Sequence, residues 1–92
     1  MVIEQGDCQK AVALYKRLLA TDLAQSDRAE AIYRLGWALR DAGLPQQAKA
    51  QFEVLHADHV ESTYWSDATY RLADYAASQG DVAQADAYLM KL

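Results

Sequence analysis

The stretch AEAIYRLGWALRDAGLPQQAKAQF, residues 29–52, decides the fold. Its apolar residues recur at helical spacing on both sides of a central Gly-Leu-Pro, which predicts two amphipathic helices joined by a tight turn. Gly43 suits the left-handed conformation that ends a helix, and Pro45 suits the first turn of the next helix. We therefore predict helices over about 27–42 and 45–58.

The first of these helices carries signals at its N-terminus and along one face. Ser26 or Asp27 is placed to cap it, and Asp27 followed by Glu30 resembles a capping box. The apolar spacing predicts which residues of the two helices are buried. They are Ala31, Ile32, Leu35, Ala38, Leu39, Ala42, Ala48, Phe52 and Leu55.

The same pattern recurs along the chain. Glycines stand at positions 6, 43 and 80, so successive glycines are 37 residues apart (43 − 6 and 80 − 43). The same shift carries Tyr33 to Tyr70 and Leu35 to Leu72. It also relates Ala11, Ala48 and Ala85; Leu18, Leu55 and Leu92; and Arg34 and Arg71. Many matches at one shift indicate an array of repeats.

The shift divides a single all-α domain into three units. We expect a partial repeat over 1–24 with its first helix reduced to residues 1–5, a full repeat over 25–61, and a third over 62–92 that is truncated at its C-terminus. Further helices are expected over about 6–20 and 63–79, and from Asp81, where Asp81-x-x-Gln84 is a start signal, to the end of the chain. The expected fold is an alpha-alpha superhelix of five helices with a truncated N-terminal stub.

Small residues stand where the two helices of a unit are expected to cross. Ala11, Ala48 and Ala85 do so on the second helices. Gly36 and Ala73 are the matching small positions on the first helices. Two helices joined by a short turn approach closely only if one side of the contact is short, so these positions support the hairpin interpretation.

Composition narrows the function classes. The chain is 52% hydrophobic with only Gly 4 and Pro 1, as expected of a folded protein. Its net charge of −4 and scattered basic residues argue against nucleic-acid binding. No apolar window is long enough for membrane insertion, the opening MVIEQGDC is not a signal peptide, and a single cysteine excludes an intrachain disulfide. The compartment stays open between cytoplasm and periplasm.

These residues resemble the tetratricopeptide repeat family. Residues 29–52 carry its leucine-small pair at Leu35-Gly36, its turn glycine, its small residue and its aromatic residue. The third unit has Leu72-Ala73, Gly80, Ala85 and Leu89 at the same offsets, so the resemblance covers nearly the whole chain. The spacing exceeds the usual ~34 residues of the family. It is similar to that of bacterial envelope proteins such as the Tol-Pal-associated coordinator and outer-membrane assembly lipoproteins. The proline that usually closes a unit is replaced by Leu23 and Val60.

The resemblance implies a protein-interaction scaffold whose concave wall, formed by the first helices, binds a peptide or a partner helix. The residues implied to face that wall are Glu30, Tyr33, Trp37, Arg40 and Asp41 in one unit, and Asp67, Tyr70, Asp74, Ala77 and Ser78 in the next. Aromatic residues in a groove supply contact area at low entropic cost. We favour the groove for Trp37, whereas Tyr33 and Tyr70 alternatively pack between hairpins with only their hydroxyls exposed.

Other chemistries have weaker support. Arg34 and Arg71 each follow an acid by four residues, at Glu30 and Asp67, which favours surface ion pairs over a clamp for a ligand carboxylate. His56 and His59 share a helical face but lack the further ligands of a zinc site, and Cys8 suits packing. No phosphate loop, nucleophile motif or paired catalytic acids are present, so we expect no enzyme and no cofactor.

The last helix is apolar on a face that no later unit covers. The residues concerned are Val82, Tyr88, Leu89, Met90 and Leu92. Because a solenoid unit cannot bury its apolar face alone, we expect the chain to be a piece of a longer array or to form homo-oligomers through its open ends. Oligomerisation is therefore the alternative function.

Overall fold

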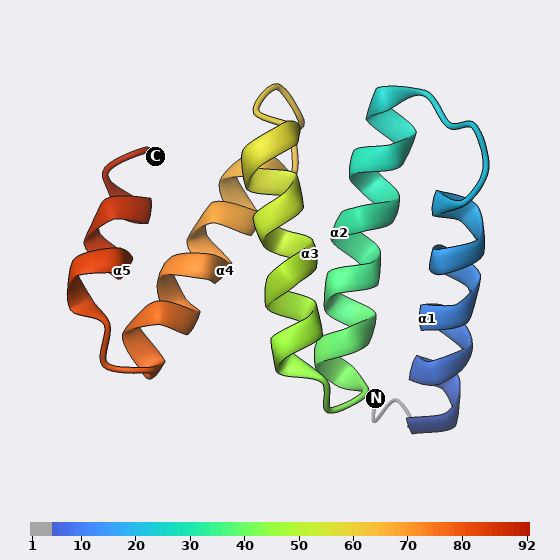
Figure 1. The fold of residues 1–92 in the computed structure, drawn as a ribbon, viewed down its shortest axis with the longest axis horizontal. Helices are drawn as coiled ribbons and strands as arrows, with labels where there is room; N and C mark the ends of the chain where they lie inside the picture. The colour runs from blue at the N-terminus through green and yellow to red at the C-terminus, as the bar shows by residue number, and fades with distance from the viewer. Residues whose placement is uncertain (1–4) are drawn as a thin grey trace.

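The computed structural model describes residues 5–92 of the chain, with side chains from Cys8 onward. It consists of five helices: α1 (Gln5–Leu19), α2 (Gln25–Asp41), α3 (Pro45–Asp58), α4 (Trp65–Ser78) and α5 (Val82–Leu89). Figure 1 shows them side by side in chain order, each packed against its neighbours in sequence. The predicted all-α repeat architecture is confirmed. The expected stub falls mainly on residues 1–4, which lie outside the described residues.

The two hairpin turns are alike in detail. Gly43 and Gly80 both have φ of 81°, the left-handed conformation expected of them. In the first turn the amide of Leu44 donates to the carbonyl of Leu39 at 2.8 Å. In the second, the amide of Asp81 donates to the carbonyl of Ala76 at 2.9 Å, which is the same bond moved by one repeat. Pro45 is the first residue of α3, as predicted.

The helix starts differ from the predictions in two places. Helix α2 begins at Gln25, and neither Ser26 nor Asp27 caps it, because both lie inside its first turn. The predicted capping box is therefore wrong. Gly6, the expected counterpart of the turn glycines, lies within α1.

Helix α5 begins as expected but is shorter. The Asp81 carboxylate accepts a hydrogen bond from the amide of Gln84 at 3.1 Å. The helix ends at Leu89, and the last residues form a turn. Helix α4 begins at Trp65, two residues later than predicted.

The core lies between α2, α3 and α4. Leu35, Leu39, Leu55 and Leu72 are almost completely buried. Around them lie the smaller or aromatic core residues Ile32, Ala48, Phe52 and Ala68. The core residues predicted for the two central helices are buried, except Ala42, which is only half-buried.

The small positions permit the close helix packing expected of them. Ala48, Ala73 and Ala85 are buried, and a Cβ atom built on Gly36 would lie 2.8 Å from Cε1 of Phe52. Ala11 is only half-buried, so its surroundings differ from those of its counterparts Ala48 and Ala85. None of the described helices is both long and apolar enough to span a membrane.

Candidate functional site

A groove opens where the C-terminal end of α2, the N-terminal half of α3 and the C-terminal half of α4 meet. Its volume is about 480 Å³. Apolar atoms of Phe52, Leu72 and Tyr75 line it together with basic side chains. The lining residues are Arg40, Pro45, Gln46, Ala48, Lys49, Phe52, Arg71, Leu72, Asp74, Tyr75, Ser78 and Gln79. Three of the predicted wall residues, Arg40, Asp74 and Ser78, are among them.

Trp37 lies beside this groove and connects it to the core. Its ring packs edge-on against Phe52 at a centroid distance of 6.1 Å. The guanidinium carbons of Arg40 and Arg71 lie 5.1 and 4.9 Å from the ring centroid, within the range of cation–π attraction. Trp37 is half-buried, so it both packs in the core and orients two charged residues of the groove.

The two tyrosines left open by the sequence behave differently. The Tyr33 hydroxyl donates to Asp67 Oδ2 at 2.7 Å, and its ring stacks on Tyr64 at a centroid distance of 4.5 Å. Burial, followed by this hydrogen bond to Asp67, raises the pKa of Tyr33. Tyr33 thus packs between hairpins, whereas Tyr70 is 50% exposed.

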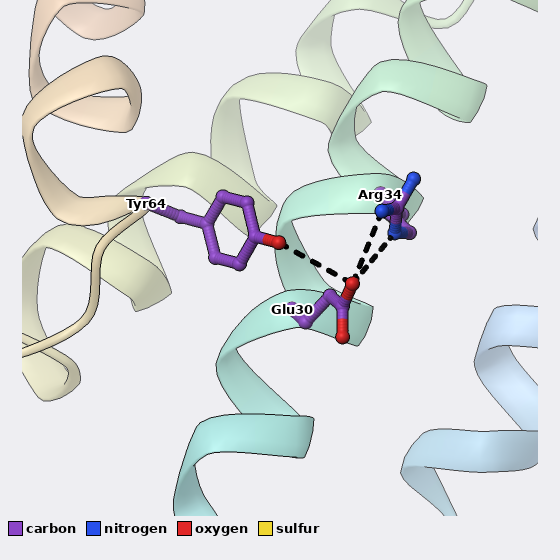
Figure 2. Close-up of polar contacts among 3 residues, drawn as sticks. All are labelled: Glu30, Arg34 and Tyr64. Atoms are coloured by element: carbon purple, nitrogen blue, oxygen red, sulfur yellow. Dashed lines mark hydrogen bonds and ion pairs between the residues drawn. The ribbon is translucent and has the colours of Figure 1, made fainter.

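Glu30 lies at the centre of a second polar contact between the units (Figure 2). Its Oε1 accepts from Arg34 Nε at 3.2 Å, from Arg34 Nη2 at 3.0 Å and from the Tyr64 hydroxyl at 3.3 Å. Arg71 forms the corresponding pair with Asp67 at 3.6 Å. Both predicted ion pairs are therefore present, and Glu30 and Asp67 hold α2 against the start of α4.

A cluster around His56 was not predicted from the sequence. Its Nδ1 shares a hydrogen bond with the buried Thr69 hydroxyl at 2.7 Å, and its carbonyl accepts from Trp65 Nε1 at 2.9 Å. Its ring stacks on Trp65 and packs edge-on against Tyr88. Burial, followed by the positive charge of Lys91, lowers the pKa of His56. Across the described residues no three His, Cys, Asp or Glu side chains are grouped to hold a metal ion.

The terminal helix presents the apolar surface expected of it, with one exception. Val82, Leu89, Met90 and Leu92 are exposed. Tyr88 is half-buried because it packs on His56. Leu92 is 55% exposed, whereas its counterpart one repeat earlier, Leu55, is 0% exposed.

Comparison with known proteins identifies one repeat. Residues 30–62, which include most of α2, all of α3 and part of the loop that follows, match the family described as the tetratricopeptide repeat. No curated protein and no solved structure matches the chain significantly. Repeats of this kind build protein-interaction scaffolds that are typically non-catalytic.

Proposed function

We propose that this chain, in which residues 30–62 form a tetratricopeptide repeat, is a scaffold that binds a peptide or partner helix in the groove between α2, α3 and α4. The observation that carries the proposal is the groove itself. It combines an apolar floor with charged side chains at its rim, which is the arrangement of a peptide-binding surface.

The wall residues divide into two groups in this proposal. Arg40, Tyr70 and Asp74 are exposed and are proposed to contact the partner, with Trp37 orienting the nearby guanidinium groups. Glu30, Tyr33 and Asp67 bond to other residues of the chain. Their proposed role is to position α2 relative to α4.

A steric block tests the groove. Ser78→Trp places a large ring among the groove-lining residues, and Ser66→Trp places the same ring on an exposed position of α4 outside the lining. Peptides selected from a displayed random library on the unmodified chain supply the ligand. We expect S78W to abolish their binding in isothermal titration calorimetry and S66W to leave it intact. Equal effects of the two variants would place binding elsewhere.

The second candidate function is oligomerisation through α5. The supporting observation is the exposure of Leu89 and Leu92 at positions whose counterparts, Phe52 and Leu55, are buried by the next helix. The double variant L89S/M90S should then lower the mass measured by light scattering at high concentration. Val60→Ser, at an exposed loop position, is the matched control. A mass independent of concentration in the unmodified chain argues against this function.

Two finer assignments are also proposals. The recurrence of turn geometry and side chains at the 37-residue shift supports units at 1–24, 25–61 and 62–92. The same spacing supports membership of an envelope-associated array. Fractionation of cells that express the protein tests the latter, because recovery in the cytosol alone contradicts it.

A further inference from the structure

We propose that the groove selects an acidic segment of a partner protein, in which several side-chain carboxylates meet Arg40, Lys49 and Arg71 while an apolar side chain meets Phe52 and Tyr75. This inference rests on the proposed function of the groove. It adds the chemical class of the partner.

The groove lining has a net positive charge, although the chain as a whole has a net negative charge. The sequence as a whole has 13 acidic and 9 basic residues. The groove lining instead has three basic side chains, from Arg40, Lys49 and Arg71, and one acidic side chain, from Asp74. An electropositive surface on an acidic protein attracts an acidic ligand to that surface specifically.

Each of the three cations lies against the face of an aromatic ring. Arg40 and Arg71 lie over Trp37, and Lys49 Nζ lies 5.3 Å from the ring centroid of Tyr75. Contact with a ring face orients a cation but leaves its charge free to attract an anion. The ring contacts therefore favour one orientation of each cation before a ligand arrives, which reduces the entropic cost of binding.

Little of this positive charge is neutralised within the chain. Among the described residues no carboxylate lies within 4.0 Å of the charged nitrogens of Arg40 or Lys49. Arg71 has Asp67 at 3.6 Å, and its Nε is buried without a hydrogen-bond partner. Carboxylates from a ligand would supply charge-assisted hydrogen bonds to the charged ends of Arg40 and Lys49 and to the terminal nitrogens of Arg71, whereas the buried Nε of Arg71 is out of reach.

The positions of the cations favour side-chain carboxylates over a single terminal one. Arg40 is on α2, Lys49 on α3 and Arg71 on α4, so the charges approach the groove from three helices. One terminal carboxylate carries a single negative charge, whereas the groove lining carries three positive charges and one negative charge. A segment with several Asp or Glu residues carries more negative charge.

A second hollow of the molecule has the opposite character. It has a volume of about 560 Å³ and lies where the N-terminus of α2 meets the loop after α3. Its charged lining residues are Asp58 and Glu61, and it contains no Lys or Arg. An acidic segment is therefore attracted to one hollow and repelled from the other, which fixes where it binds.

Selection and charge reversal test the proposal. A displayed random peptide library is selected on the intact chain, and the enriched peptides are measured by fluorescence anisotropy. We expect Asp and Glu beside an aliphatic or aromatic residue, and weaker binding at high salt. Arg40→Glu or Lys49→Glu should each weaken binding by about tenfold or more, because each places like charges in contact.

The control is Arg17→Glu, an exposed residue of α1 that changes the net charge equally. An equal loss of affinity in R17E overturns the inference, because only net charge then matters. Loss of binding on amidation of the peptide C-terminus also overturns it, as does a concentration-dependent complex of the chain with itself that R40E abolishes. Suppose that S78W abolishes binding of the enriched peptides and R40E leaves it unchanged, whatever the charge of the peptides. This result overturns the inference but supports the proposed function. If no enriched peptide is blocked by S78W, both fail.

Discussion

Because Gly36 has no side chain, the ring of Phe52 fits against the backbone of α2 at this position. A Cβ atom at this position would lie 2.8 Å from Cε1 and 2.9 Å from Cζ of that ring. The ring cannot easily move away, because it is buried and packs edge-on against Tyr33 and Trp37. The missing side chain of Gly36 therefore sets the distance between α2 and α3.

We expect Gly36→Ala to destabilise the protein by about 1–3 kcal/mol, the usual cost of overpacking a core. This loss should exceed the ~1 kcal/mol that alanine gains over glycine in a helix. Urea denaturation followed by circular dichroism measures the effect.

A double-mutant cycle identifies its cause. Phe52→Leu removes the ring, so the G36A change should cost less in the F52L background than in the unmodified protein. Additive losses would contradict the proposed clash.

His56 makes the stability depend on pH. Its pKa is lowered in the folded protein, below the value of about 6.5 of an unfolded histidine. As the pH falls through that value, the unfolded chain binds a proton that the folded chain binds only at lower pH. The free energy of unfolding should therefore be constant above this window and decrease on acidification below it.

Thermal unfolding at mildly acidic and at neutral pH measures this dependence. His56→Gln, which cannot titrate, should show a smaller decrease than the unmodified protein over the same interval. An identical decrease in H56Q would assign the pH dependence to other groups.

The residue-scale contacts were only partly predictable. The leucine-small pair and the two ion pairs follow from spacing within one helix, and both were predicted. The bond from Tyr33 to Asp67 joins residues 34 apart in sequence, and no local spacing indicates it. Trp37 was expected in the groove, but its ring is shared between Phe52 and two guanidinium groups, and only the packed helices reveal this arrangement.

At the scale of elements, the turns decide where helices begin. Asp81 follows Gly80, whose φ of 81° ends α4 and fixes the start of α5, so the carboxylate reaches the amide of Gln84. No such glycine precedes α2, which extends to Gln25 and encloses Asp27 in its first turn. The two Asp-x-x-Glu/Gln patterns are equivalent in sequence, and the preceding backbone distinguishes them.

Alanine at these two aspartates should therefore have unequal effects. Asp81→Ala removes a cap and should cost about 1 kcal/mol. Asp27→Ala removes only a charge near a helix N-terminus, worth about 0.3 kcal/mol on an exposed helix. Amide hydrogen exchange of α5 and of α2, together with thermal unfolding, compares them. Equal losses would show that Asp27 also acts as a cap.

Across the whole molecule, each helix packs on its neighbours in sequence. The central helices have a neighbour on both sides, so they contribute more to the stability of the fold than the terminal helices do. The repeat shift was sufficient to predict this arrangement, because equivalent positions at one shift require equivalent packing. It failed at the first unit, where Gly6 is helical and Ala11 is only half-buried. Ala11 is thus less buried than its counterparts Ala48 and Ala85.

Leu35, almost fully buried in the central helix, should then affect the whole fold. We expect Leu35→Ala to lower the free energy of unfolding by about 2–5 kcal/mol. Leu14→Ala, at an exposed position of α1, should change it by about 0.5 kcal/mol or less. Chemical denaturation measures both. Similar losses would mean that α1 is as central to stability as α2.

The two tyrosine–carboxylate bonds between units have a mechanical consequence. One runs from Tyr33 on α2 to Asp67 on α4, and the other runs back from Tyr64, just before α4, to Glu30 on α2. Two attachment points resist rotation of one hairpin about the other, which a single point would allow. The phenol groups of Tyr33 and Tyr64 thus restrict the angle between the two hairpins. Replacing both tyrosines with phenylalanine would remove both bonds and make this junction easier to bend.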